Sequence, residues 1–215
     1  MATATRPATD RPDIDRPPRV PDAPTLIVPA DVRLTVDPEG FAALCAANRD
    51  LRLERDSDGG VVVMAPASSD GGGRNLALGA RIWNWNEATG LGRAFDSSAG
   101  FTLPNGAVRA PDVSWMTRER WEAVPQDERR RFARVVPDFV VELRSPSDAP
   151  KDLRAKMAEY LSQGVRLGWL IDPEAQTVEI YRPGREAETL ARPETLSGED
   201  VLPGLVLELK GVLFD

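Results

Sequence analysis

The sequence predicts one domain of the mixed α/β (α+β) class, in which helices are interspersed among a larger number of strands. Three observations lead to this prediction. Short apolar or alternating segments typical of strands outnumber the helical segments and mix with them along the chain. The 215 residues suffice for one domain with a full core, and no internal repeat is found. Hydrophobic residues make up 41% and charged residues 28%, which is ordinary for a soluble globular protein.

The first 29 residues differ in composition from the rest of the chain. Prolines alternate there with aspartates and arginines, which predicts a disordered arm or a strap on a partner. Residues 30–215 are expected to form the single domain. Its first element is a helix that Asp37 caps and Pro38 opens, and that Asn48 ends.

A β-hairpin is expected next, with strands over 51–55 and 61–64 on either side of an Asp- and Gly-rich turn. The glycine run 71–73 predicts a break in the chain before a helix over about 74–87. That helix has little polar surface and is expected to be well buried. The following stretch predicts strands near 93–95, 101–103, 108–110 and 111–116, and short polar helices over 118–124 and 126–133 that cover a sheet edge. The last third predicts a helix over 151–162 that stops at Gly164, strands over 166–171 and 177–181, and an edge strand over 205–209.

The strand around which the domain is organised lies between residues 137 and 147. Its apolar residues predict burial, yet it contains a carboxylate, Glu142. Because alternate residues of a strand share a face, Asp138, Glu142 and Arg144 point one way. A buried charge costs roughly several kcal/mol unless it is paired or bound to a metal. A partner for Glu142 is therefore expected.

Composition limits the chemistry that the chain can perform. There is no histidine and only one cysteine, Cys45, which excludes Ser-His triads, histidine-ligated zinc and an internal disulfide. Oxygen-ligated Mg²⁺ or Mn²⁺ is the metal class left open. The net charge of −7 argues against a broad nucleic-acid-binding surface, although it leaves room for a local basic cleft. No apolar run approaches the ~20 residues needed to cross a bilayer, and no secretory signal is found, so a cytoplasmic protein with no membrane partner is expected.

Two acidic residues on separate strand segments suggest a metal site. Asp112 follows a proline just before one strand, and Glu142 lies inside another strand thirty residues later. Taken singly, a Pro-Asp pair is more often a turn or a strand entry. Two carboxylates from adjacent strands, however, can hold one or two divalent ions, which remove the repulsion between them. Such an ion would support phosphoryl or carbonyl hydrolysis.

A cation is expected beside these carboxylates, and two residues could provide it. Arg144 lies on the same strand face as Glu142 but cannot usefully deprotonate water. Lys156 lies on the next predicted helix and could have a lowered pKa if it is buried near other cations; alone, it would more often be a solvated lysine. Glu54 in the first hairpin is a third acidic candidate, for which a solvent-exposed position is also adequate.

An ordered series of segments resembles the Uma-type family of bacterial endonucleases. The series comprises the first hairpin, the segment around Asp112, Pro137-Asp-Phe-Val-Val-Glu-Leu-Arg-Ser-Pro-Ser-Asp148, Lys156-Met-Ala-Glu-Tyr160, Gly164-Val-Arg-Leu-Gly-Trp-Leu-Ile-Asp-Pro173 and Val178-Glu-Ile-Tyr181. The resemblance covers about residues 41–183. It implies a restriction-endonuclease-like PD-(D/E)XK fold, with a central mixed sheet flanked by helices, and Mg²⁺-dependent phosphodiester hydrolysis.

The resemblance also implies roles for individual residues. Asp112 matches the motif aspartate and Glu142 the motif acid, so these two would bind Mg²⁺ or Mn²⁺. Arg144 stands where the general motif has lysine, and the lysine would come instead from the following helix as Lys156. Glu54 matches an early acidic position. Arg74 or Asn75 stands near the position where many members have a histidine, and would contact phosphate.

These observations predict a Mg²⁺-dependent endonuclease that hydrolyses DNA phosphodiester bonds, with Lys156 orienting or activating water and Arg144 stabilising phosphate charge. The alternative is a catalytically weak or inactive nuclease-fold module for nucleic-acid binding or assembly. A third reading is a metal-independent structural protein, in which Glu142 is merely paired with Arg144 or Lys156. A homodimer is expected, because cutting both strands needs two active centres.

Overall fold

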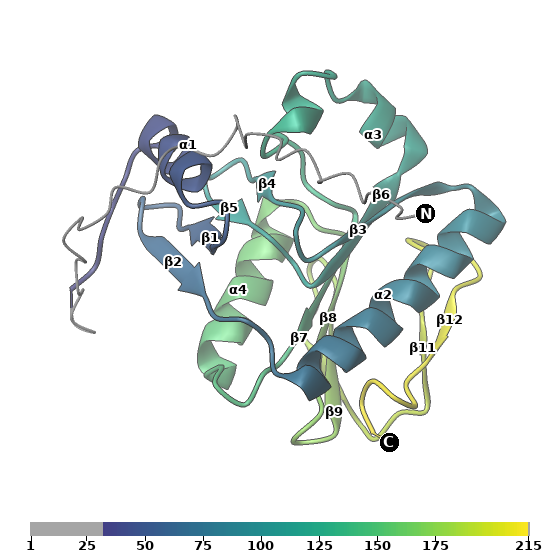
Figure 1. Ribbon diagram of the computed structural model, residues 1–215. Helices are drawn as coiled ribbons and strands as arrows, with labels where there is room; N and C mark the ends of the chain where they lie inside the picture. Colours follow the sequence, from purple (N-terminus) through teal and green to yellow (C-terminus); the bar gives the residue numbers. More distant parts are fainter. Residues whose placement is uncertain (1–31, 215) are drawn as a thin grey trace, which may run out of the picture. The chain divides into compact units, whose positions relative to one another are not determined.

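The computed structural model describes residues 32–214, so the arm predicted for residues 1–29 lies outside the described residues. The helices and strands belong to the compact unit Leu34–Asp215 (Figure 1). The helices are α1 (Pro38–Ala47), α2 (Ser69–Thr89), α3 (Arg118–Ala123) and α4 (Pro150–Gln163), with a 3-10 turn η1 (Glu128–Arg130). The strands are β1 (Arg52–Arg55), β2 (Val61–Met64), β3 (Gly92–Asp96), β4 (Phe101–Thr102), β5 (Val108–Arg109), β6 (Val113–Thr117), β7 (Phe139–Leu143), β8 (Leu167–Asp172), β9 (Thr177–Tyr181), β10 (Glu188–Ala191), β11 (Thr195–Ser197) and β12 (Val206–Glu208).

The largest sheet is mixed and has six strands in the order β10-β9-β8-β7-β6-β3. β7 and β8 are parallel, whereas the other neighbours are antiparallel. Parallel neighbours need a crossover connection, and α4 provides it. A smaller sheet, β2-β1-β5-β4, contains the N-terminal hairpin. The predicted class, a central mixed sheet flanked by helices with an N-terminal hairpin, is confirmed.

The alternation of β7 divides the core into two layers. Phe139 and Val141 pack with residues of α2 and of the C-terminal segment, while Val140 packs with Met157 and Tyr160 of α4. Figure 1 shows α4 on one side of β7 and β8 and α2 on the other. Because alternate residues of a strand share a face, Glu142 faces α4 together with Val140. The sequence pattern of β7 therefore determines which helix can supply a partner for Glu142.

The predicted start and burial of the second helix were wrong. The glycine run lies inside α2, because the Ser68 side chain caps the helix and accepts a hydrogen bond from Gly71 N at 3.1 Å. Only one side of the helix meets the sheet. Leu78 and Ile82 are fully buried, whereas Leu76 is 74% exposed and Trp83 is 51% exposed.

One further helix prediction was wrong, and the last predicted strand is present. The helix expected over 126–133 is only the 3-10 turn η1, because the next residues extend to meet β4: Thr102 N donates to Ala133 O at 2.9 Å. The edge strand expected over 205–209 is present as β12, an edge strand because among the described residues it pairs only with β11, in a separate two-stranded sheet.

Gly92 gives a test of the packing between β3 and β6. A Cβ at this position would lie 2.2 Å from the backbone oxygen of Met116 and 2.4 Å from the buried Trp115 ring. We expect Gly92→Ala to lower the free energy of unfolding by about 1–3 kcal/mol, as overpacking does. Gly72→Ala is the matched control, because nothing lies within 4 Å of its Cβ position and helical alanine is favoured by roughly 0.5–1 kcal/mol. Equal urea midpoints for the two variants would contradict this packing.

Candidate active site

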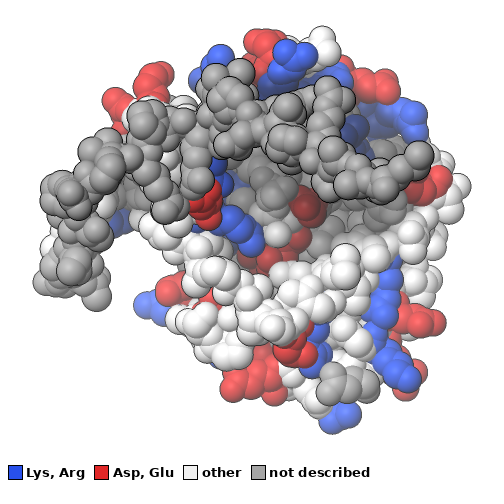
Figure 2. Space-filling view, viewed as in Figure 1, with Lys and Arg blue, Asp and Glu red and all other residues white. Residues whose placement is uncertain are grey.

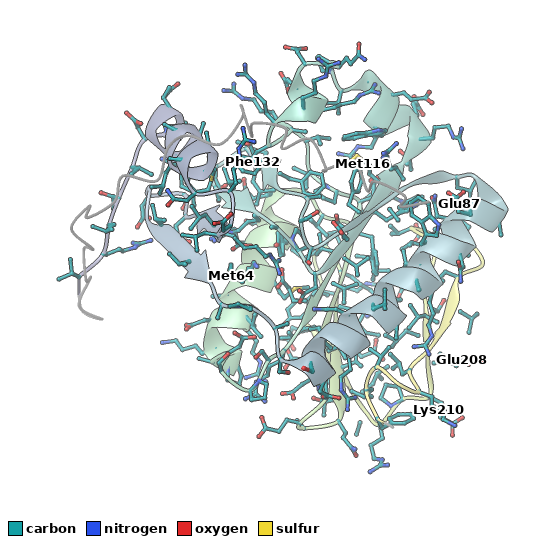
Figure 3. The ribbon with its side chains drawn as sticks, in the orientation of Figure 1. Met64, Glu87, Met116, Phe132, Glu208 and Lys210 are labelled. Carbon is teal, nitrogen blue, oxygen red and sulfur yellow. The ribbon has the colours of Figure 1, made fainter. Side chains whose placement is uncertain are left out.

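A cleft of about 1040 Å³ opens where β1, β2, the first turns of α2, the end of β7 and α4 meet. Met64, at the end of β2, lies on its wall (Figure 3). Glu54, Asp112, Glu142 and Lys156 all line this cleft. Figure 2 shows acidic side chains with basic ones at the centre of this face of the molecule, between the first strands and α2. The cleft therefore brings together charged residues that are far apart in the sequence.

The pairing of β6 with β7 places two carboxylates next to each other. In the antiparallel register Val113 lies opposite Val141, so Asp112, which directly precedes β6, lies at the level of Glu142. The backbone N–H of Leu143 donates a hydrogen bond to Asp112 Oδ2 at 2.8 Å and fixes this carboxylate. Asp112 and Glu142 thus face the same cleft from neighbouring strands.

Lys156 of α4 connects two glutamates from different sheets. Its Nζ lies 2.9 Å from Glu54 Oε1 and 3.0 Å from Glu142 Oε1. The Lys156 side chain is only 12% exposed and Glu54 only 2%, so the solvent-exposed alternatives for both residues were wrong. Glu54, Asp112, Glu142 and Lys156 are hereafter called the carboxylate–lysine cluster.

The two Pro-Asp pairs of the sequence have different surroundings. Asp112 adjoins the cluster, whereas Asp138 is buried at the other end of β7. Asp138 accepts hydrogen bonds from Arg120 Nη1 at 2.6 Å and from the backbone N–H of Thr117 at 3.0 Å. These contacts tie α3 to the sheet and give Asp138 a structural role.

Neighbouring residues hold the two glutamates in place. Tyr160 donates its hydroxyl to Glu142 Oε1 at 2.9 Å, and the backbone N–H of Ala110 donates to Glu54 Oε1 at the same distance. Arg109 contacts Glu54 at 3.3 Å. The same guanidinium also binds the carboxylates of Asp56 at 2.8 Å and Glu159 at 2.6 Å. Sequence reasoning missed Arg109, because β5 has only two residues and so carries no periodic signal.

The pKa values of Glu142, Asp112 and Lys156 are all raised, but for different reasons. Burial raises the pKa of Glu142 to about 7; Lys156 opposes this shift, while Asp112 and Glu54 reinforce it. Burial also raises the pKa of Asp112, against the hydrogen bond from Leu143. Burial alone would lower the pKa of Lys156, but the negative charges of Glu142 and Glu54 outweigh it and raise that pKa. In the metal-free protein these charges favour the ammonium form of Lys156, which donates hydrogen bonds to the glutamates.

Arg144 lies apart from the cluster, although it lines the same cleft. Its Nη1 lies 3.1 Å from Asp172 Oδ2 and 2.7 Å from Glu174 Oε2. Its charge is thus already balanced by two carboxylates, and Lys156 is the cation that meets Glu142. The predicted role of Arg144 in stabilising phosphate charge stays a prediction.

Two residues at the start of α2 had been expected to contact phosphate. Arg74 binds Asp70 Oδ2 at 2.9 Å and the backbone oxygen of Val212 at 2.9 Å. Asn75 Nδ2 lies 3.5 Å from Asp112 Oδ1. Both residues line the cleft, and Asn75 adjoins the carboxylates.

The donor set fits a hard divalent cation bound by few protein ligands. Within residues 32–214 no group of three or more acidic, histidine or cysteine side chains is gathered closely enough to hold a metal ion. Mg²⁺ does not need such a group, since it usually keeps several waters and binds through one or two carboxylates and substrate phosphates. Asp112 and Glu142 provide two such carboxylates. Burial is the largest cause of the raised pKa of each carboxylate, and a divalent ion bound between them would offset it by supplying positive charge.

Comparison with known proteins gives one family and one fold. The model of the family described as "Putative restriction endonuclease" (Uma2) matches residues 38–210. No curated protein matches the chain. Among solved structures, the chain is similar to one titled as a putative nuclease belonging to DUF820, from Anabaena variabilis. The TM-score is 0.64 and the identity 21%, over 75% of this chain and 89% of that chain. At this identity the likeness concerns the fold, which is nuclease-like.

Across the described residues, no helix has the length and apolar character that a membrane crossing requires.

Proposed function

The chain belongs to the Uma2 family of putative restriction endonucleases, and from this premise we propose that it is a Mg²⁺- or Mn²⁺-dependent endonuclease that hydrolyses DNA phosphodiester bonds. One observation carries the proposal: Asp112 and Glu142 lie opposite each other on adjacent strands at a cleft, with the Lys156 ammonium against Glu142. This is an arrangement of oxygen ligands and a cation that phosphoryl transfer requires, since such catalysis is mostly positioning and charge stabilisation.

Asp112 and Glu142 are the residues that would hold the cation. When bound, the ion would polarise a phosphoryl oxygen and lower the pKa of a water molecule. The protein orients these ligands itself: the Leu143 N–H fixes Asp112, and the Tyr160 hydroxyl fixes Glu142. Hydrogen bonds of this kind support metal ligands and set their orientation.

Lys156 contributes charge and hydrogen bonds. Because its pKa is raised, it keeps its proton and can donate to a water molecule or to a phosphate oxygen entering the cleft. Glu54 and Glu142 hold the ammonium in place, and Arg109 in turn holds Glu54. Of the two roles expected for Lys156, orienting water is the one that these contacts support, and activating water stays a prediction.

Incubation of the purified protein with supercoiled plasmid tests the proposal. We expect nicked and linear DNA in the presence of Mg²⁺ or Mn²⁺ and none after addition of EDTA. Binding of plasmid without cleavage under any of these conditions would contradict the proposal and would support a nuclease-fold binding module instead.

The homodimer stays a prediction. It rests on the argument that two cuts in opposite strands need two active centres.

Stability in the absence of divalent cations is expected to depend on pH through Glu142. Its pKa rises from 4.5 to about 7 on folding, so between these values the folded state holds a proton that the unfolded state has lost. The contribution of protonated Glu142 to the stability of the folded state is complete below pH 4.5 and is lost as the pH rises through 7. In EDTA, we expect wild type to lose stability between pH 5.5 and pH 8 relative to Glu142→Gln, which cannot titrate there. Parallel melting-temperature profiles for the two proteins would contradict this assignment.

A further inference from the structure

A second cleft, of about 700 Å³, lies away from the candidate active site and shares no lining residue with it. It is formed by α1, β3, β4 and the segment around η1. Arginine is its most frequent charged residue, and no Asp or Glu lines it. The cleft is hereafter called the arginine cleft, and its arginines are Arg49, Arg93, Arg129, Arg130 and Arg131. Figure 2 shows basic side chains, with acidic ones among them, at the top of this face over α3 and η1.

The charge of the arginine cleft is not cancelled by carboxylates. Arg49, Arg130 and Arg131 are exposed, and none of them forms an ion pair within the part of the chain that the structure describes. Arg129 donates to two backbone oxygens, those of Glu122 and Val124, both at 2.8 Å. Such neutral acceptors leave the positive charge in place. A concentration of uncompensated arginines in a protein of net charge −7 is a local field that attracts polyanions.

Aromatic rings give the arginine cleft a rigid floor. Two guanidinium groups lie over the Trp121 ring, with Arg93 5.5 Å and Arg129 5.2 Å from its centroid. Phe95 meets the Trp121 ring edge-on at 4.9 Å. On the α1 side, Phe132 packs against Phe41 at 5.6 Å (Figure 3). Cation–π contacts fix the orientation of Arg93 and Arg129 without neutralising them.

We propose that the arginine cleft binds the phosphate backbone of a nucleic acid, outside the candidate active site. Guanidinium groups bind phosphate bidentately, and phosphate contacts position a protein on nucleic acid without reading its sequence. The five groups come from three segments, after α1, in β3 and around η1, and four of them are exposed. This suits successive phosphates of a strand better than one enclosed small anion. This proposal holds whether or not the active site cleaves DNA, since it uses different residues.

Binding of a labelled duplex in EDTA, followed by fluorescence anisotropy over a range of salt concentrations, tests the proposal. We expect Arg130→Ala/Arg131→Ala to weaken binding at least about tenfold at low salt. The slope of log affinity against log salt should fall by about 1.8, at roughly 0.9 per lost phosphate contact. The matched control is Arg185→Ala/Arg192→Ala, which removes the same charge from exposed arginines near β9 and β10, at the opposite edge of the six-stranded sheet from β3. Equal affinity and slope for the two double variants, or no binding by wild type, would overturn the proposal.

Cys45 provides an independent readout, because it is the only cysteine of the chain and lines the arginine cleft. We expect the duplex to slow alkylation of Cys45 in wild type but not in Arg130→Ala/Arg131→Ala. Equal protection by inorganic triphosphate at the same phosphate concentration would overturn the assignment to nucleic acid and indicate a small-anion site.

The outcome is separable from that of the endonuclease proposal. Cleavage of plasmid in Mg²⁺ tests Asp112 and Glu142, whereas binding of the duplex in EDTA tests the arginine cleft. A wild type that binds through this cleft without cutting leaves the arginine-cleft proposal standing and removes only the endonuclease. If wild type cuts DNA and Arg130→Ala/Arg131→Ala binds the duplex as tightly as wild type, the endonuclease proposal stands and the arginine-cleft proposal falls.

Discussion

Lys156→Met is expected to lower the free energy of unfolding by about 3–5 kcal/mol in EDTA, the cost of leaving a buried charge without its partner. Lys156 is the only cation of the carboxylate–lysine cluster, and it lies within 3.0 Å of both Glu54 and Glu142. Its removal leaves two buried carboxylates facing each other, and methionine replaces the aliphatic stem but not the charge. Urea unfolding of the variant beside wild type measures the difference.

Two comparisons separate the lost charge from a general effect of the substitution. Lys151→Met makes the same change at an exposed position of α4 and is expected to change stability by less than about 0.5 kcal/mol. Glu142→Gln/Lys156→Met also removes the carboxylate that, among the described residues, Lys156 alone pairs, since Glu54 keeps Arg109, and should recover part of the loss, as neighbours in one network do. Equal effects of Lys151→Met and Lys156→Met would show that Glu54 and Glu142 do not need this partner.

Asp112→Asn and Glu142→Gln are each expected to lower the DNA cleavage rate at least about 100-fold at saturating DNA. Each variant removes one of the two carboxylates proposed to hold the cation, and even partners behind the ligands typically contribute 10–100-fold in metal affinity or activity. Both substitutions keep size and hydrogen bonding close to the original. Initial nicking rates at a fixed Mg²⁺ concentration provide the measurement.

The matched control for these variants is Glu174→Gln, which alters an exposed carboxylate on the rim of the same cleft. We expect it to stay within about threefold of wild type, because surface ion pairs contribute little. If Asp112→Asn cleaved as fast as Glu174→Gln, then Asp112 would not be a ligand. Repeating the rates over a Mn²⁺ titration distinguishes weaker metal binding, which excess metal restores, from a loss of catalysis.

Much of the fold follows from local patterns in the sequence. The alternation of β7 predicts its two packed faces, and the single carboxylate on one of them predicts a partner at Glu142. Asp37, Pro38 and Asn48 predict the ends of α1, since capping depends on neighbouring residues alone. A metal site can likewise be proposed from two carboxylates on separate strand segments. The register of β6 with β7 then brings these two residues, Asp112 and Glu142, together.

Other features depend on contacts that no local pattern contains. Glu54 of β1 and Lys156 of α4 are separated by 102 positions, so only the tertiary structure shows that they meet. The glycine run was expected to break the chain, but the cap at Ser68 and the open surface beside Gly72 and Gly73 allow α2 to pass through it. Leu76 and Leu78 are the same residue type two positions apart, yet one is exposed and the other buried. Only the position of the sheet against α2 decides which of them is covered.

The central claim is that Asp112 and Glu142 together hold a divalent cation, and crystals soaked in Mn²⁺ test it most directly. Anomalous difference density at the manganese absorption edge locates the ion without assuming any activity. The geometry predicts a peak between the carboxylates of Asp112 and Glu142 in wild type and no peak there in Asp112→Asn. Absence of the peak in wild type, or a peak only at Asp172 and Glu174 beside Arg144, would contradict the proposed metal site.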